Sequence, residues 1–245
     1  MLRKAVLGEI LKLKNSFIWY VLIALPLISV LIGCGNFYLN QGILTKQWYS
    51  LWTQVSLFYG EFFFPILIAI FCAYICRLEH MNHNWNNIMT LPINLKNIFL
   101  SKLAVISVLT AITQIVFVIF YIVAGNMFAF PDSIPKELTG WIIKGWIISI
   151  SIASIQLYMS IKIRSFATPI GISLCLSLFG MGLLIAKPSI GIFFPYSMLG
   201  SAMGIIKQSA LSINDTMVSI CVAFITTLVF SEIANRNFKK NDVIS

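Results

Sequence analysis

The chain has 245 residues, of which 59% are hydrophobic and only 10% are charged. Soluble domains average about 45–50% apolar and about 25% charged residues, so this composition excludes a water-soluble fold and predicts an integral membrane protein. The net charge of +9 does not indicate nucleic-acid binding, because the basic residues stand between apolar runs and form no basic domain.

The first 16 residues have the periodicity of an amphipathic helix. Apolar side chains recur every three or four positions, at Leu2, Val6, Ile10, Leu13 and Phe17. Four basic side chains and one acid lie off that face: Arg3, Lys4, Lys12, Lys14 and Glu9. The pattern predicts an N-terminal interfacial helix over residues 1–16, with its basic residues toward anionic head groups on the cytoplasmic side. A simple basic flank of the first span is the alternative.

Six apolar runs follow, each close to the length of about 20 residues that crosses a hydrocarbon core of about 30 Å. We place the spans near residues 17–37, 57–75, 103–124, 141–161, 166–186 and 216–234. They are expected to be helices, because backbone groups in lipid must find partners within their own segment. We therefore predict an all-α membrane fold with six transmembrane helices in a single domain, 1–245.

Lysine and arginine are divided unevenly between the segments that join these spans. If both termini lie inside, the inner segments hold twelve of the 17 basic residues: Arg3, Lys4, Lys12, Lys14, Arg77, Lys96, Lys102, Lys162, Arg164, Arg236, Lys239 and Lys240. The outer segments hold the other five: Lys46, Lys136, Lys144, Lys187 and Lys207. This bias predicts that both termini are cytoplasmic.

Two outer segments have unusual compositions. Residues 38–56 carry aromatic rings typical of the head-group level, at Tyr38, Trp48, Tyr49 and Trp52. Residues 187–215 are apolar, but Pro188, Pro195 and several glycines break them into pieces too short to cross a membrane. We expect a re-entrant segment there before the sixth helix, buried against protein.

The longest polar stretch on the inner side, residues 77–102, reads RLEHMNHNWNNIMTLPINLKNIFLSK. Apolar anchors stand among its polar residues: Trp85, Ile88, Met89, Leu91, Ile93 and Ile98. A short amphipathic helix of this kind docks its apolar side in a groove of a partner, so the segment predicts a contact with a protein outside the membrane. Two plainer interpretations stay open: Trp85 as an interfacial anchor and Pro92 as a helix start.

The chain lacks the motifs of common nucleotide and catalytic sites. It contains no G-x-x-x-x-G-K-[ST] phosphate loop, no dinucleotide fingerprint, no H-E-x-x-H and no G-x-S-x-G. His80 and His83 stand one helical turn apart without a third histidine, so solvated loop histidines are favoured over a metal site. Cys72 and Cys76 share a helix face, where small side chains filling helix contacts are favoured over a metal pair. We expect no catalytic residue, cofactor or metal in this chain.

Two acidic residues are candidates for an intramembrane role. Glu61 lies near the outer end of the second predicted span, and Glu232 lies about one turn from the inner end of the sixth. Both are expected to be solvated or paired, Glu232 with Arg236 at helical spacing. The middles of the spans then hold no ionisable group, so the energy for any transport must come from elsewhere.

This layout resembles the permease subunit of type-2 ABC exporters: a basic N-terminal helix, six spans with both ends inside, a structured inner segment and a broken segment before the last span. The local match runs through Glu79, Trp85, Leu91-Pro92, Ile98 and Lys102. The N-terminal MLRKAVLGEILKLKNSF and the PYSM at 195–198 are similar to lantibiotic-protection and bacitracin-resistance permeases of Gram-positive bacteria.

The resemblance implies a bacterial cell-membrane assembly of two permease chains, identical or related, with two copies of a cytoplasmic ATPase that binds ATP and Mg²⁺. Residues 77–102 would be the coupling loop seated on that ATPase. The expected coupling residues are Glu79, Trp85, Leu91, Pro92 and Lys96. The cargo would be a membrane-active antimicrobial peptide, expelled for self-protection or resistance.

Three other functions stay open from the residues alone. The same architecture could export another amphipathic drug, a lipid or a polysaccharide. The chain could instead be a non-transporting membrane anchor that recruits a soluble partner through residues 77–102. An intramembrane enzyme is the least favoured, because no pair of catalytic groups shares a depth in the predicted spans.

Overall fold

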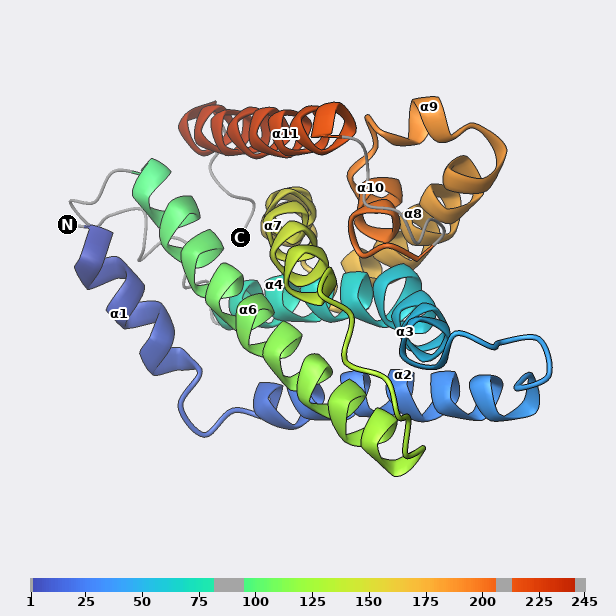
Figure 1. Cartoon of the computed structure of the whole chain (residues 1–245). Coiled ribbons are helices and arrows are strands. Elements are labelled where there is room, and N and C mark those ends of the chain that lie inside the picture. Colours follow the sequence, from blue (N-terminus) through green and yellow to red (C-terminus); the bar gives the residue numbers. More distant parts are fainter. Residues whose placement is uncertain (1, 82–94, 206–212, 241–245) are drawn as a thin grey trace.

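The computed structural model describes residues 2–81, 95–205 and 213–240, and all the regular elements in these ranges are helical (Figure 1). The elements are α1 (Leu2–Lys12), α2 (Ile18–Leu39), α3 (Gln47–Phe58), the π-helical turn η1 (Tyr59–Phe63), α4 (Phe64–His80), α6 (Leu95–Met127), α7 (Leu138–Lys162), α8 (Ala167–Ala186), α9 (Pro188–Gly191), α10 (Pro195–Ala202) and α11 (Ile213–Lys240). Six helical stretches are long and apolar enough to cross a membrane: Ile18–Leu39, Gln47–His80, Lys96–Met127, Leu138–Lys162, Ala167–Ala186 and Asp215–Asn237. The all-α fold with six spans is confirmed.

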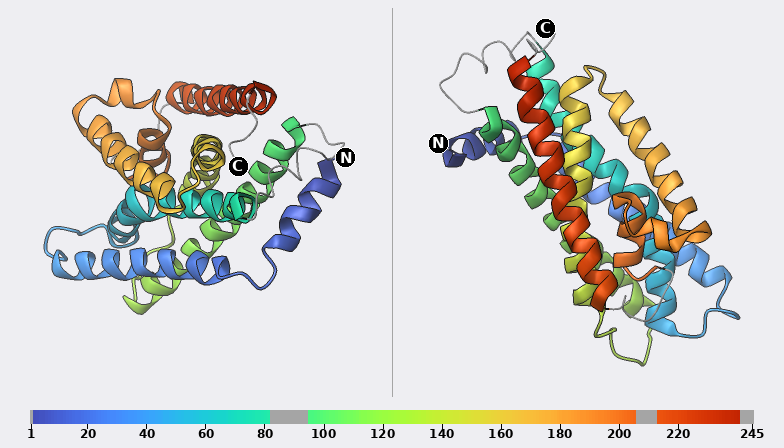
Figure 2. Two further views of the ribbon diagram at one scale, coloured as in Figure 1. Left: turned by 180° about the vertical axis from the view of Figure 1, so that it is seen from behind. Right: turned by 90° about the horizontal axis from the view of Figure 1, so that it is seen from above.

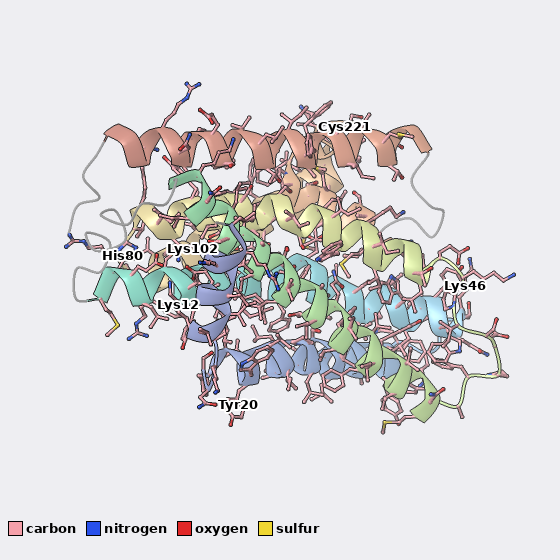
Figure 3. The ribbon with its side chains drawn as sticks, turned by 90° about the vertical axis from the view of Figure 1, so that its left-hand side faces the viewer. Lys12, Tyr20, Lys46, His80, Lys102 and Cys221 are labelled. Carbon is pink, nitrogen blue, oxygen red and sulfur yellow. The ribbon has the colours of Figure 1, made fainter. Side chains whose placement is uncertain are left out.

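The long helices form a bundle, and α1 crosses them near one end (Figure 3). That end also carries His80 and the C-terminal end of α11 (Figures 2 and 3). Helix α1 packs against α6. Its crosswise orientation agrees with the predicted interfacial helix.

The second span begins ten residues earlier than hydropathy predicts. Residues 47–56 belong to helix α3, which continues through η1 and α4 as one stretch, Gln47–His80. This part of 38–56 is therefore a helix that packs in the bundle and not a separate outer segment. Trp52 is fully buried, stacks on Trp141 with ring centroids 5.3 Å apart, and donates its indole N–H to the Met203 carbonyl at 2.8 Å.

The polar residues of α3 explain why its hydropathy misleads. Gln54 accepts a hydrogen bond from the Asn36 amide of α2 at 2.5 Å, and the Thr53 hydroxyl donates to the Ser50 carbonyl at 2.8 Å. Polar side chains whose hydrogen-bonding groups have partners can be buried in a helix bundle at low energetic cost. The third span also begins earlier than predicted, at Lys96 in place of 103, and its helix α6 begins within the predicted coupling loop.

The segment before the sixth helix is broken into short pieces, as its prolines predict. Helix α9 is four residues long, and α10 packs against α7, α8 and η1. Tyr196 of α10 is buried, and its hydroxyl accepts a hydrogen bond from the Gln156 amide at 2.6 Å. Gly204, with a positive φ of 69°, turns the chain back beside Trp141. The prediction that this segment is buried against protein is confirmed for α10, whereas Ile190 and Phe193 before it are 51% and 65% exposed.

Two hydrogen bonds link α3 to the connection before α7, at the end of the bundle opposite His80: the Trp48 indole N–H donates to the Asp132 carbonyl at 2.9 Å, and the second joins Tyr49 to Glu137. The Tyr49 hydroxyl donates to Glu137 Oε2, and this bond lowers the pKa of the Glu137 carboxyl. A carboxyl whose pKa is lower in the folded state stabilises the fold above its unfolded pKa. That contribution is lost as the pH falls through the folded pKa.

We expect Tyr49→Phe to reduce the acid sensitivity of the purified protein. Its melting midpoint should fall less than that of the wild type when the pH is lowered from about 6 to about 3, because the Glu137 contribution is already missing. Tyr38→Phe, at a well-exposed site, is the control. Equal pH profiles for wild type and Tyr49→Phe would show that the bond contributes nothing.

Candidate functional site

The end of α4 and the first turns of α6 bring two charged side chains of the predicted coupling loop together. Lys102 Nζ pairs with Glu79 Oε1 and lies 3.1 Å from Glu9 Oε1 of α1. Lys12 of α1 joins them, with its Nζ 2.9 Å from Glu9 Oε1 and 2.8 Å from Glu79 Oε1. We call these four residues the ionic cluster. Figure 3 shows Lys12 and Lys102 side by side near His80.

The ionic cluster is buried and balanced. The Lys102 side chain has no exposed surface, Glu79 is 2% exposed and Glu9 is 6% exposed, whereas the Lys12 side chain is 30% exposed. Two ammonium groups face two carboxylates, which offsets the cost of removing four charges from water. Glu9 Oε2 and Glu79 Oε2 nevertheless have no hydrogen-bond partner among the described residues. The cluster therefore holds one arrangement of α1, α4 and α6 but does not saturate its own acceptors.

Helix α1 differs from the sequence prediction in the face that it packs. The helix itself is observed, and Val6 and Leu13 turn inward as expected. Leu2 and Ile10, however, are 42% and 49% exposed, while Glu9 is buried against α6. The buried face of α1 includes Glu9, and not Leu2 and Ile10, because the buried Lys102 requires a carboxylate opposite it. A lone acid within a basic helix was the signal that could have indicated this pairing.

The predicted coupling residues divide into two groups. Glu79 lies in the ionic cluster, and Lys96 is exposed in the first turn of α6. Trp85, Leu91 and Pro92 lie outside the described residues. The positive charge of Lys96 acts on the carboxylate of Glu232 in α11. Lys96 and Glu232, which are distant in the chain, therefore lie close enough for their charges to interact.

Glu232 has the partner that its spacing predicts. Its Oε1 lies 3.2 Å from Arg236 Nε, one helical turn along α11. Both side chains are largely exposed, at 47% and 74%. An exposed ion pair of this kind contributes little to stability, because water and salt screen the two charges. Glu232 is thus a surface residue of α11.

The described histidine and cysteine residues that could bind a metal instead contact the backbone of neighbouring helices or pack in the core. His80 Nε2 lies 2.8 Å from the Ser160 carbonyl of α7, and His83 lies outside the described residues. Cys72 and Cys76 are buried, with Cys72 Sγ 3.6 Å from the Ala153 carbonyl. Within 2–81, 95–205 and 213–240, no three histidine, cysteine or acidic side chains form a group that could hold a metal ion.

Glu61 lies deeper than predicted. It is in the middle of η1, inside the continuous stretch Gln47–His80, and only 2% of it is exposed. Neither carboxylate oxygen has a hydrogen-bond partner in the described part of the chain. The expectation that Glu61 is solvated or paired near an interface is therefore wrong, because the helix begins earlier than hydropathy indicates. The second candidate span therefore contains a buried ionisable side chain.

The surroundings of Glu61 connect it to the broken segment. Its carboxyl reaches Gly200 of α10 so closely that a Cβ at position 200 would collide with Oε1. A π-helical turn inserts one residue into a helix and often marks a functional position. A carboxylate without a partner is costly to bury, so the neutral acid is the form that fits this position. Glu61 is a polar contact between the second span and α10.

One comparison with known proteins gives a match. The family model described as "ABC-2 family transporter protein" matches residues 5–180, which include α2 to α7 complete, the ionic cluster and Glu61. No curated protein matches the chain.

Proposed function

Because this chain belongs to the ABC-2 family of transporter proteins, we propose that it exports a membrane-active antimicrobial peptide and that the ionic cluster transmits the driving movement. Membership makes it a multi-pass membrane permease subunit of an ABC transporter, which works with a separate ABC ATPase and is not itself the ATPase. The cargo, the direction of transport and the way in which ATP hydrolysis is coupled to transport are what we propose beyond family membership.

The ionic cluster is the observation that carries the coupling proposal. Glu79 and Lys102 stand at the two ends of the segment that is expected to sit on the ATPase, and both bind α1 through Glu9 and Lys12. A push on the segment between them moves α4 and α6 together and takes α1 with them. ATP binding then shifts the permease between two arrangements through contacts that differ between them.

The proposed assembly contains two permease chains and two ATPase subunits in a bacterial cell membrane. ATP and Mg²⁺ would be held by the ATPase subunits. The excess of basic residues in the segments at the His80 end supports placing that end, with both termini, in the cytoplasm. Trp85, Leu91 and Pro92 would supply the apolar side of the helix that docks on the ATPase.

The close packing of the bundle interior supports the proposal that the cargo is amphipathic and enters from the lipid. Large aromatic side chains such as Trp52, Phe117 and Trp141 fill the interior in this arrangement of the helices. A molecule already dissolved in the membrane reaches the outer side without a wide aqueous channel. The likeness of the N-terminus and of residues 195–198 to peptide-resistance permeases favours a lantibiotic or bacitracin-like peptide over other amphipathic molecules.

Co-purification from detergent tests the coupling proposal. The chain is co-expressed with its candidate ATPase as wild type, Trp85→Ala and Leu91→Asp. Leu39→Asp is the control, because Leu39 is the last residue of α2 and is 81% exposed. We expect the ATPase to remain with wild type and Leu39→Asp and to be lost from the two loop variants. A wild-type chain that purifies alone from a host containing the ATPase would contradict the docking role.

Growth tests address the cargo separately. Cells carrying the complete transporter should tolerate higher concentrations of a lantibiotic or of bacitracin, but not of an antibiotic that acts inside the cell. Unchanged tolerance to all membrane-active peptides in the panel would reject this cargo. That result would leave the family membership of the chain and the coupling proposal unaffected.

A further inference from the structure

A groove of about 960 Å³ opens between α1, the turn that follows it, the start of α2 and α6. Its walls are mostly apolar and include Val6, Trp19, Val108 and Ile112, while Lys14 stands at its edge in the turn. Figure 1 shows α1 and α6 side by side on one flank of the molecule. We propose that this groove binds one anionic phospholipid, with an acyl chain along α6 and the phosphate at Lys14.

The turn that carries Lys14 is held in place by hydrogen bonds. Asn15 has a positive φ of 58°, which reverses the chain between α1 and α2. The Trp19 indole N–H donates to the Leu13 carbonyl at 3.0 Å, and the Lys14 N–H donates to the Leu11 carbonyl at 3.2 Å. Lys14 is therefore kept beside the apolar groove and does not move freely with a loose terminus.

The charges around the groove select a negatively charged occupant. Glu9, the one acid of α1, points into the ionic cluster, where Lys102 and Lys12 neutralise it. Arg3 and Lys4 are exposed on the same helix, and the described residues contribute no acidic side chain to the groove wall. The field at the groove is positive, which attracts anionic lipid head groups and repels a cationic peptide.

The apolar wall selects a lipid tail. Val108 of α6 is 58% exposed, and the lining from Ala104 to Ile112 extends for about 12 Å along the helix at 1.5 Å per residue. A long acyl chain covers such a strip, whereas a soluble phosphate compound has nothing to place there. The groove is thus positively charged at one end and apolar along its length, which is the pattern of an interfacial lipid site.

Trp19, in the groove wall, reports directly on the occupant. The full chain is reconstituted in phosphatidylcholine vesicles that contain a small fraction of phosphatidylglycerol, and bromine atoms are placed on the acyl chains of one lipid or the other. Trp19 quenching is the wild-type signal minus that of Trp19→Phe. We expect brominated phosphatidylglycerol to quench Trp19 at lower fractions than brominated phosphatidylcholine does.

Lysine variants show whether the preference comes from this site. Lys14→Gln should reduce the preference for phosphatidylglycerol about fivefold, as expected for one basic residue at the membrane surface. Lys46→Gln, at the opposite end of the bundle in Figure 3, should leave it unchanged. Both substitutions are at exposed positions and should preserve the fold.

Three outcomes would overturn the proposal. Equal quenching by both lipids would mean that the groove meets only bulk lipid. Quenching by neither would mean that protein covers it, such as a second copy of this chain. An equal loss in Lys14→Gln and Lys46→Gln would mean that net charge, and not Lys14, sets the preference.

Discussion

Replacing Lys102 by methionine is expected to lower the stability of the folded chain by about 3–5 kcal/mol. The Lys102 side chain is completely buried, and its removal leaves Glu9 and Glu79 facing each other with only the partly exposed Lys12 as a counter-charge. Removing one partner of a buried ion pair costs far more than the pair itself contributes. The melting midpoint of the detergent-purified protein measures the loss.

Lys12→Met is the matched control for this change. It removes the same charge from the same cluster, but at a position that is 30% exposed and with Lys102 still in place. We therefore expect a much smaller fall in the midpoint. Equal midpoints for wild type and Lys102→Met would show that the cluster does not hold α1, α4 and α6 together.

A neutral version of the cluster separates stability from coupling. The triple variant Glu9→Gln, Glu79→Gln, Lys102→Met leaves no buried charge among the three side chains, so it should recover most of the lost stability. If the cluster transmits movement, this stable variant should still bind the ATPase but lose export. Wild-type export by the triple variant would show that the cluster only supports the fold.

The large features of the fold follow from the sequence because they depend on composition over many residues. Six apolar runs with basic residues between them are sufficient to predict six membrane helices. The prolines at 188 and 195 predict the broken segment, since proline interrupts the hydrogen bonds of a helix. These properties are local in the chain, so no knowledge of the packing is needed.

The ionic cluster and the position of Glu61 could not be predicted in this way. Glu9 and Lys102 are distant in the chain, and only the packing of α1 on α6 brings them together. Lys102 looked like one more basic flank of a span. Glu61 looked peripheral because the polar residues of α3 hid the true start of the second span. Both errors arise from tertiary contacts that satisfy polar groups, which hydropathy does not include.

The contact between α2 and α3 supplies the second large effect. Gly33 of α2 is buried against α3, and a Cβ at this position would lie 2.5 Å from Val55 Cα and 2.7 Å from Val55 N. Backbone atoms of a packed helix cannot move aside as the end of a side chain can. We expect Gly33→Ala to destabilise the protein by about 3 kcal/mol, at the upper end of the usual cost of overpacking. The melting midpoint again measures this.

Gly35, two positions further along the same helix, makes a sharp control. A Cβ there meets nothing within 4 Å, so Gly35→Ala should leave stability unchanged or raise it by up to about 1 kcal/mol through helix propensity. The pair of variants distinguishes the observed fold from the prediction made from hydropathy. If residues 47–56 formed an outer segment that did not pack on α2, no helix would face Gly33, and both alanines would behave alike. A large loss at Gly33 alone requires that α3 packs along α2, which is also the packing that places Glu61 deep in the bundle.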